Sequence, residues 1–266
     1  MKAPGTGRST GGVVAAATAD APADDELPRR AAMAVFLAFA LAYFLSALLR
    51  AVTATLSPAL SAQFALPARD LGLLAGGYFL GFSAMQLPLG SWLDRFGPRR
   101  ISVALLALAA LGCAVFALAE GFAGLMAARV LMGVGVAAGL MAPLTGYRRW
   151  FAPGLQLRAN AWMLMTGSLG MLASTLPVHW LLPHLGWRGL FWVLAALVLL
   201  AMAVIARVVP RWRNAPQYIA TCEMSAPAES QKHTYAEVVA HPAFRHAVPL
   251  GMVSFGGMVA IQSLWA

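Results

Sequence analysis

Seven long apolar runs, separated by polar connections, occupy most of this chain. Each run is close to the roughly 20 apolar residues that an α-helix needs to cross the hydrocarbon core of a bilayer. The runs cover residues 33–57, 71–91, 101–119, 122–146, 159–182, 189–209 and 247–266. The pattern therefore predicts seven membrane-spanning helices in an all-α membrane protein.

The polar segments divide the chain into four regions. Residues 1–32 are rich in Ala, Gly, Thr, Pro and Asp without periodicity, so we expect a disordered tail rather than a cleaved signal peptide. Residues 33–209 hold six spans with short connections and are expected to form one six-helix transmembrane bundle. Residues 210–246 contain four prolines and form a long linker, which leaves 247–266 as a seventh helix.

Basic residues are distributed unevenly over the connections. If the N-terminus is cytoplasmic, fifteen of the 19 Lys and Arg residues fall in cytoplasmic segments, and only Arg69 and Arg188 fall in outer loops. Connections rich in Lys and Arg stay on the cytoplasmic side of a membrane. We therefore expect a multi-pass protein of the plasma (inner) membrane with its N-terminus and linker in the cytoplasm.

Composition excludes several other classes of protein. The chain is 60% hydrophobic and 11% charged, with a mean hydropathy of +0.72, which is typical of a membrane protein. The formal charge of +9 does not predict a nucleic-acid partner, because the basic residues lie in connections and not on one soluble face. Cys113 lies in an apolar run and Cys222 in a polar segment, so we expect no disulfide between them.

The connection between the second and third runs has a distinctive sequence. It reads Gly90-Ser91-Trp92-Leu93-Asp94-Arg95-Phe96-Gly97-Pro98-Arg99-Arg100. Its glycines allow close packing and a tight turn, and its aspartate is suited to accept hydrogen bonds from a facing helix N-terminus. The segment resembles the loop between helices 2 and 3 of the major facilitator superfamily, G-x-x-x-D-R-x-G-x-R-R, and departs from it at Trp92, Leu93 and Pro98. The retained residues are Gly90, Asp94, Arg95, Gly97, Arg99 and Arg100, which the resemblance implies act in conformational switching.

Further resemblances to this superfamily extend over most of residues 33–266. The segment 129–135 is similar to the R-x-x-x-G-x-G pattern of helix 4, and its glycines, with Gly139, are expected to let that helix approach a neighbour closely. The segment 186–188 resembles the turn before helix 6, with its Trp and Arg expected at the outer interface.

Membership would imply two six-helix bundles that rock about a central site. Six spans, a long linker and one further span would then be an N-terminal bundle and the first helix of a second, incomplete bundle. We therefore expect that this chain is truncated from a transporter of about twelve spans.

Two arginines lie inside predicted spans, where ionisable residues are costly and functional by default. Arg50 lies about seven residues from the outer end of the first run and Arg129 about seven from that of the fourth, each about 10 Å deep. The resemblance implies that helices 1 and 4 line the central cavity. Since the six complete spans carry no mid-membrane carboxylate, we interpret both arginines as substrate-binding residues for a small organic or inorganic anion. Two alternatives stay open: Arg129 satisfies carbonyls or pairs with Glu120 or Asp70, and Arg50 extends to the outer interface.

The function that the sequence predicts is secondary active transport of a small solute by alternating access, with a proton as the candidate coupling ion. His179 and His184 are too few for a metal site, and no cofactor or catalytic motif is present, so we expect no enzyme. A seven-helix membrane receptor or sensor is the alternative. Such receptors generally have the opposite orientation, and the retinal-binding kind needs a lysine that residues 247–266 lack.

Overall fold

The computed structural model describes residues 26–212 and the single positions 249, 253 and 257. Residues 26–212 fold into α-helices without any β-strand. The helices are α1 (Arg29–Phe64), α2 (Ala68–Leu118), α3 (Phe122–Gly135), α4 (Ala138–Trp150), α5 (Pro153–Ala173) and α6 (Leu176–Val208). Four helical stretches are long and apolar enough to cross a membrane, so the prediction of an all-α membrane protein is confirmed. The expected tail, linker and seventh helix lie almost entirely outside the described residues.

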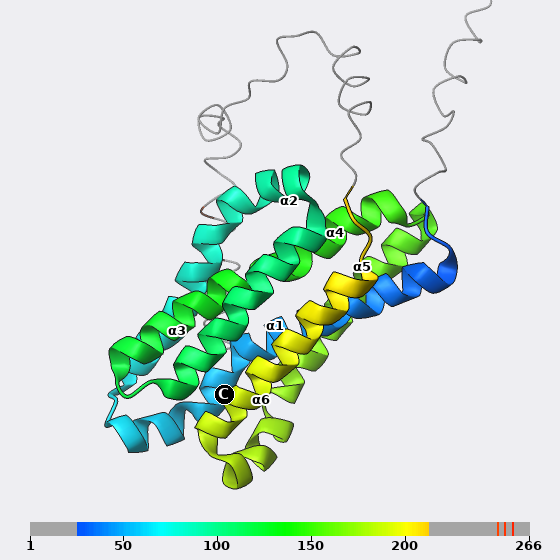
Figure 1. Cartoon of the computed structure of the whole chain (residues 1–266). Coiled ribbons are helices and arrows are strands. Elements are labelled where there is room, and N and C mark those ends of the chain that lie inside the picture. The colour runs from blue at the N-terminus through cyan, green and yellow to red at the C-terminus, as the bar shows by residue number, and fades with distance from the viewer. Residues whose placement is uncertain (1–25, 213–248, 250–252, 254–256, 258–266) are drawn as a thin grey trace, which may run out of the picture.

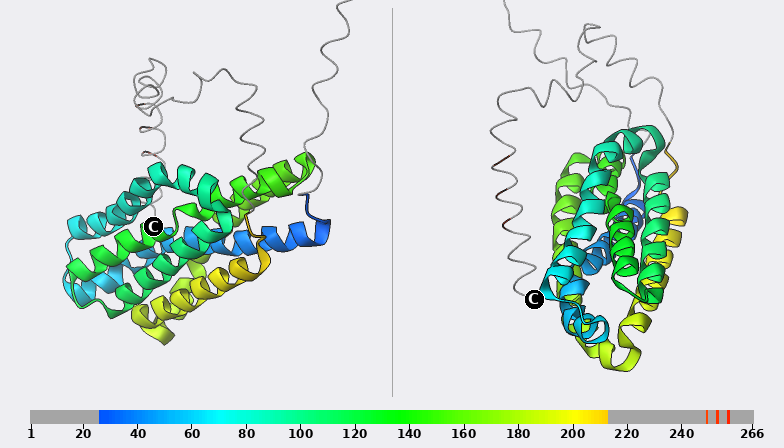
Figure 2. Two further views of the ribbon diagram at one scale, coloured as in Figure 1. Left: turned by 45° about the horizontal axis from the view of Figure 1, so that its top comes forward. Right: turned by 90° about the vertical axis from the view of Figure 1, so that its left-hand side faces the viewer.

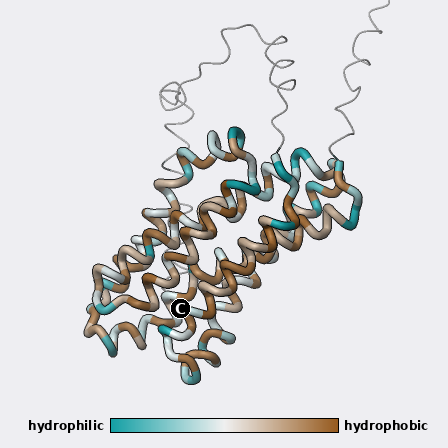
Figure 3. Tube along the Cα trace, in the orientation of Figure 1, coloured by the Kyte–Doolittle hydropathy of each residue, from teal (hydrophilic) through white to brown (hydrophobic). Residues whose placement is uncertain are grey.

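The helices run back and forth between the two ends of an elongated bundle (Figures 1 and 2). One end, the Gly97 end, holds the start of α1, the bend in α2 and the ends of α4 and α6. The opposite end, the Gly186 end, holds the α1–α2 and α2–α3 connections and the bend in α6. Figure 3 shows apolar residues along the middle of the helices and polar residues gathered toward their ends.

Arginines are concentrated at the Gly97 end. The arginines within about two helical turns of that end are Arg29, Arg30, Arg95, Arg99, Arg100, Arg148, Arg149, Arg158, Arg207 and Arg211. The Gly186 end holds only Arg69 and Arg188 among the described residues. The bundle is therefore strongly polarised in charge along its long axis.

Glycines with positive φ bend two of the helices sharply. α2 is 51 residues long, or about 75 Å at 1.5 Å per residue, which is more than twice the thickness of a hydrocarbon core. It reverses at Gly97, whose φ of 78° is readily adopted only by glycine, so α2 supplies the second and third predicted spans. Gly186, with φ 64°, bends α6 in the same way.

Several boundaries differ from the sequence prediction. α1 continues to Phe64, and α2 stays helical through most of the predicted loop until Gly97. The predicted fourth span is interrupted at Val136 and Ala137, and the predicted fifth span is interrupted at 174–175. Apolar composition alone extends through these points, so hydropathy could not locate the breaks.

Glycines bring α2 and α3 into contact along their backbones. A Cβ atom on Gly81 would collide with the carbonyl oxygen of Val130, and one on Gly133 would collide with the carbonyl oxygen of Tyr78. Gly135 is likewise pressed against the backbone of Ala109. The prediction that the glycines of the fourth span permit close helix approach is confirmed, as is usual where helices associate in a membrane.

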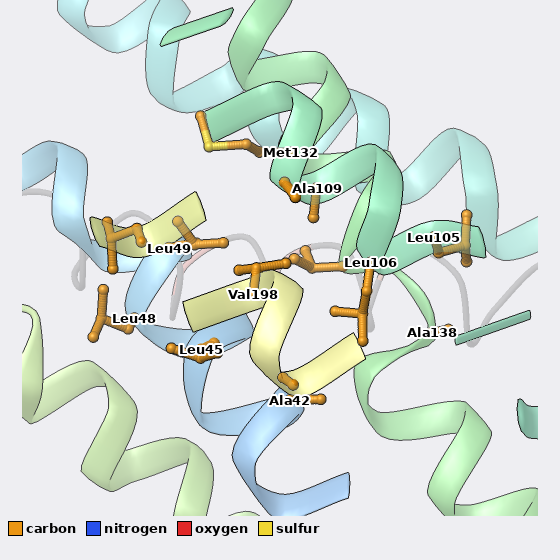
Figure 4. Close-up of a cluster of buried hydrophobic side chains, with 14 of the residues drawn as sticks. Ala42, Leu45, Leu48, Leu49, Leu105, Leu106, Ala109, Met132, Ala138 and Val198 are labelled. Atoms are coloured by element: carbon orange, nitrogen blue, oxygen red, sulfur yellow. The ribbon is translucent and has the colours of Figure 1, made fainter. Parts of the chain in front are cut away.

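The bundle has an apolar interior and an apolar exterior. Figure 4 shows side chains from α1, α2, α3, α4 and α6 meeting in the interior, among them Leu49, Leu106, Met132 and Val198. The outer surface carries many exposed large apolar side chains. Those on α2 and α5 include Leu73, Leu80, Leu87, Trp162, Leu164, Met165, Leu169 and Leu172. So much exposed apolar surface would promote aggregation in water, whereas lipid covers it without cost.

Trp187 corrects one expectation. Instead of facing the outer interface it is 7% exposed, packs against Phe64 and Phe116, and donates a hydrogen bond of 2.5 Å from Nε1 to Gln63. Arg188 donates to the Ala119 carbonyl at 3.0 Å. The Gly186 turn therefore locks α6 onto α1 and α2.

The α2–α3 approach gives the first prediction. Gly133→Ala places a methyl group against the Tyr78 carbonyl, so the two helices must separate at a cost of about 1–3 kcal/mol. Gly76→Ala is the matched control, because nothing lies within 4 Å of the position of its added methyl. Thermal unfolding of the purified protein in detergent should show a lower Tm for Gly133→Ala and an unchanged or higher Tm for Gly76→Ala. Equal Tm values for the two variants would contradict the packing.

Candidate functional site

The two intramembrane arginines meet at one tyrosine. Arg50 on α1 and Arg129 on α3 both lie beside Tyr78, which belongs to the first half of α2. Tyr78 is 1% exposed, and its hydroxyl donates to the Ser46 carbonyl at 3.3 Å. Because α1 extends to Phe64, Arg50 lies about 21 Å from the end of its helix, deeper than the sequence suggested. Because both guanidinium groups lie beside Tyr78, they are nevertheless at a similar depth in the bundle.

Arg129 is held rigidly inside the bundle. Its exposure is 0%, and its Nη1 donates to the Leu49 carbonyl at 2.9 Å. Its guanidinium carbon lies 5.9 Å from the centre of the Tyr78 ring and 5.6 Å from that of Phe116, distances at which an aromatic face attracts a cation. Its Nε and Nη2 have no hydrogen-bond partner among the described residues. Of the alternatives left by the sequence, this contact with a carbonyl is the one observed, rather than pairing with Glu120 or Asp70.

Arg50 is only partly buried. Its guanidinium carbon lies 5.5 Å from the centre of the Phe82 ring, and its Nε has no hydrogen-bond partner among the described residues. No carboxylate of residues 26–212 is hydrogen-bonded to it. Arg50 is therefore the more accessible of the two cations, although its unpartnered Nε is itself buried and its guanidinium also lies beside Tyr78.

A small cavity lies one to two helical turns from Arg50 and Arg129, toward the break between α3 and α4. Its volume is about 10 Å³, which suits roughly one water molecule. It is lined by Phe39, Ala42, Ser46, Ser102, Leu106, Gly135, Val136, Ala138 and Gly139. The cavity is therefore too small to hold more than a molecule of about that size. No group of three or more metal-binding side chains occurs among the described residues.

The residues of the predicted switch loop lie at the Gly97 end. Gly90 and Asp94 are exposed on the last turns before the bend, and Arg95 lies over the ring of Phe96 at 5.3 Å. The guanidinium of Arg99 donates to the Ala206 carbonyl near the end of α6, whereas Arg100 is exposed. The side-chain hydrogen bonds within residues 26–212 do not include Asp94.

Sequence reasoning missed the aromatic residues of the site. Tyr78, Phe82 and Phe116 sit in apolar runs, where aromatic side chains are ordinary packing residues. The available signal was the spacing of Tyr78 and Phe82, which at i and i+4 face the same side of α2. The spacing alone did not indicate a site, because the arginines that contact these rings belong to other helices, α1 and α3.

Comparison with known proteins identifies the family. The sequence pattern described as Major Facilitator Superfamily matches residues 39–265 of this chain. The chain belongs to the major facilitator superfamily. The resemblance found in the sequence is thereby confirmed, and the chain is a member of a family of multi-pass membrane transporters.

Two curated members of the superfamily illustrate the likeness. The inner membrane transport protein YajR of Escherichia coli (strain K12) is 30% identical over 175 residues, covering 65% of this chain and 36% of that protein. The methyl viologen resistance protein SmvA of Salmonella typhimurium (strain LT2) is 30% identical over 157 residues, covering 58% of this chain and 32% of that protein. The chain thus spans about a third of the length of these relatives.

Solved structures of the superfamily share the fold. The bacterial homolog of the human lysosomal transporter Spinster, in an inward-facing and unoccupied conformation, gives a TM-score of 0.66 at 20% identity. The match covers 89% of this chain and 56% of that one. The D-xylose–proton symporter gives a TM-score of 0.57 at 18% identity, covering 74% of this chain and 52% of that one. At such identities the likeness concerns the fold alone.

Proposed function

We propose that this chain forms the N-terminal part of a secondary active transporter that moves a small anion by alternating access, with Arg50 as its principal binding group. The observation that carries the proposal is the pair of arginines around Tyr78, of which Arg50 is partly exposed and has one donor, Nε, without a partner among the described residues. Family membership supports the transport function. The proposed division is a bundle over 33–209, a linker over 210–246 and a further helix over 247–266.

The charges of the bundle favour an anion. The carboxylates of residues 33–209 are Asp70, Asp94 and Glu120, and all three lie near helix ends or in a connection. The charged side chains at middle depth are Arg50 and Arg129. A cationic solute would be repelled by both, whereas an anion would neutralise a guanidinium that is costly to keep unpaired away from water. A charge-assisted, bidentate pair with arginine would supply binding energy and orientation.

Arg50 and Arg129 are proposed to differ in role. Arg129 is fixed by the Leu49 carbonyl and two aromatic rings, so it contributes a positive potential from behind Tyr78. Arg50 is partly exposed and lies beside Tyr78 and the ring of Phe82, so its guanidinium is the one available to turn toward a solute. Both remain candidate substrate-binding residues, with direct contact assigned to Arg50.

The orientation follows from the charge polarity of the bundle. Ten arginines at the Gly97 end against two at the Gly186 end support a cytoplasmic Gly97 end. The N-terminus would then be cytoplasmic. In alternating access, Arg50 would be open first to one side of the membrane and then to the other.

The loop residues Gly90, Asp94, Arg95, Gly97, Arg99 and Arg100 are proposed to act in conformational switching. Asp94 is exposed three residues before the bend and remote from Arg50, so it is available to a partner helix and not to a bound solute. Asp94→Asn should therefore slow transport severalfold while equilibrium binding of the transported solute stays nearly unchanged. Equal losses of binding and transport would assign Asp94 to the binding site instead.

The proposed function is tested by uptake into proteoliposomes containing the protein as its native gene produces it. Phosphate, nitrate and a small carboxylate represent anions, D-xylose represents neutral solutes, and methyl viologen represents cations. We expect uptake of an anion, reduced at least about tenfold by Arg50→Ala because a charged hydrogen-bond pair is lost. Arg50→Lys keeps the charge but loses the bidentate geometry, so it should also be strongly impaired. Collapsing the pH gradient tests a proton as the coupling ion.

Two outcomes would overturn the proposal. Uptake of D-xylose or methyl viologen without uptake of any anion would refute the substrate class. Full anion uptake by both Arg50→Ala and Arg129→Ala would refute the role of the arginines, even if the protein is a transporter. Arg69→Ala, at the Gly186 end, is the matched control and should leave uptake unchanged.

A further inference from the structure

The chain that leaves α6 crosses the Gly97 end of the bundle and covers the bend in α2. α6 ends at Val208, and the described residues that follow it form the gold end of the trace in Figure 1. Within them, Trp212 lies against Gly97. A Cβ atom on Gly97 would overlap the side chain of Trp212 and would lie 2.8 Å from its ring atom Cδ2. Gly97 is therefore needed twice, once for its φ of 78° and once because the tryptophan occupies the space of a side chain.

Two residues at the end of α4 complete the surroundings of Trp212. The ring of Trp150 meets it edge to face, with centroids 6.1 Å apart, and the guanidinium carbon of Arg149 lies 4.8 Å from the centre of a Trp212 ring. Edge-to-face packing and a cation over an indole are both favourable arrangements. We call Gly97, Arg149 and Trp150 the Trp212 site.

Neighbouring contacts fix the walls of this site. The carbonyl of Trp150 accepts a hydrogen bond of 3.0 Å from the backbone N–H of Leu27, which holds the end of α4 against the segment before α1. Arg99, two residues beyond Gly97, donates to the Ala206 carbonyl and so holds the bend of α2 against the end of α6. The site thus lies on two helices separate in sequence, α2 and α4, which these contacts hold against the end of α6 and the segment before α1.

We infer that Trp212 is an anchor that fastens residues 210–212, which leave α6, to the bend of α2, so that these residues and the bend at Gly97 move as one unit. The anchor is an intramolecular binding site whose occupant is the chain's own tryptophan. A displacement of Trp212 is then transmitted directly to the point where α2 reverses. This inference does not depend on which solute the protein carries.

A pair of glycines gives a matched test of the contact. Gly97 and Gly186 both have positive φ, but nothing lies within 4 Å of a Cβ placed on Gly186. Gly97→Ala should lower the Tm more than Gly186→Ala, by about 2–4 °C or more, because only Gly97→Ala also displaces Trp212. When Trp212 is also replaced by glycine, Gly97→Ala and Gly186→Ala should lower the Tm by the same amount. A difference that persists without Trp212 would refute the contact.

A distance measurement tests the coupled motion. Spin labels are placed on cysteines at Arg95 and Arg211, both exposed, after Cys113 and Cys222 are replaced. With Trp212 present the distribution of label distances should be narrow. It should broaden in Trp212→Ala and stay narrow in Trp212→Phe, which keeps an aromatic ring in the site. Trp180→Ala, at an exposed tryptophan (69%) near the Gly186 end, is the control and should change nothing. An unchanged distribution in Trp212→Ala would overturn the anchor.

Discussion

The close approach of α2 and α3 is the constraint on which the rest of this structure depends. Gly81 and Gly133 let each helix rest on a backbone carbonyl of the other, at Val130 and at Tyr78. In a membrane no hydrophobic effect drives helices together, so packing at this closeness is a principal source of association. Since Gly133 lies one turn after Arg129 and touches the backbone of Tyr78, the same contact brings the arginine against the tyrosine ring.

Because of this contact, the two intramembrane arginines differ in their surroundings and in their exposure. Arg129 lies within the contact, where two rings and the Leu49 carbonyl replace its lost hydration. Arg50 approaches Tyr78 from α1 and keeps part of its surface open. This difference is the reason why the proposed function assigns direct contact with a solute to Arg50 and not to Arg129.

Much of this architecture could be predicted from the sequence, and the reasons for the exceptions are physical. Hydropathy predicted an all-α membrane protein, and the glycine spacing of 133 and 135 located a close helix contact. The break at Val136–Ala137 escaped prediction because it occurs within apolar sequence, and the break at Ser174–Thr175 because two polar residues do not interrupt a long apolar run. The Tyr78 site and the Trp212 site also escaped, since each joins residues of different helices whose pairing depends on packing. The position of Trp187 was predicted wrongly for a related reason, because a tryptophan near a helix end is suited both to a membrane interface and to a protein core.

The central claim is that Arg50, unlike the residues packed around it, is reached from water inside the membrane-embedded bundle. The most direct measurement is the reaction of a membrane-impermeant thiol reagent with single cysteines, in intact cells and in inverted vesicles, after replacement of Cys113 and Cys222. Arg50→Cys should react, whereas Leu49→Cys in the core and Leu169→Cys on the apolar exterior should not. Pro183→Cys should react from the outside and Arg211→Cys from the inside, which fixes the orientation. Failure of Arg50→Cys to react from either side, while both reference positions react, would contradict the account.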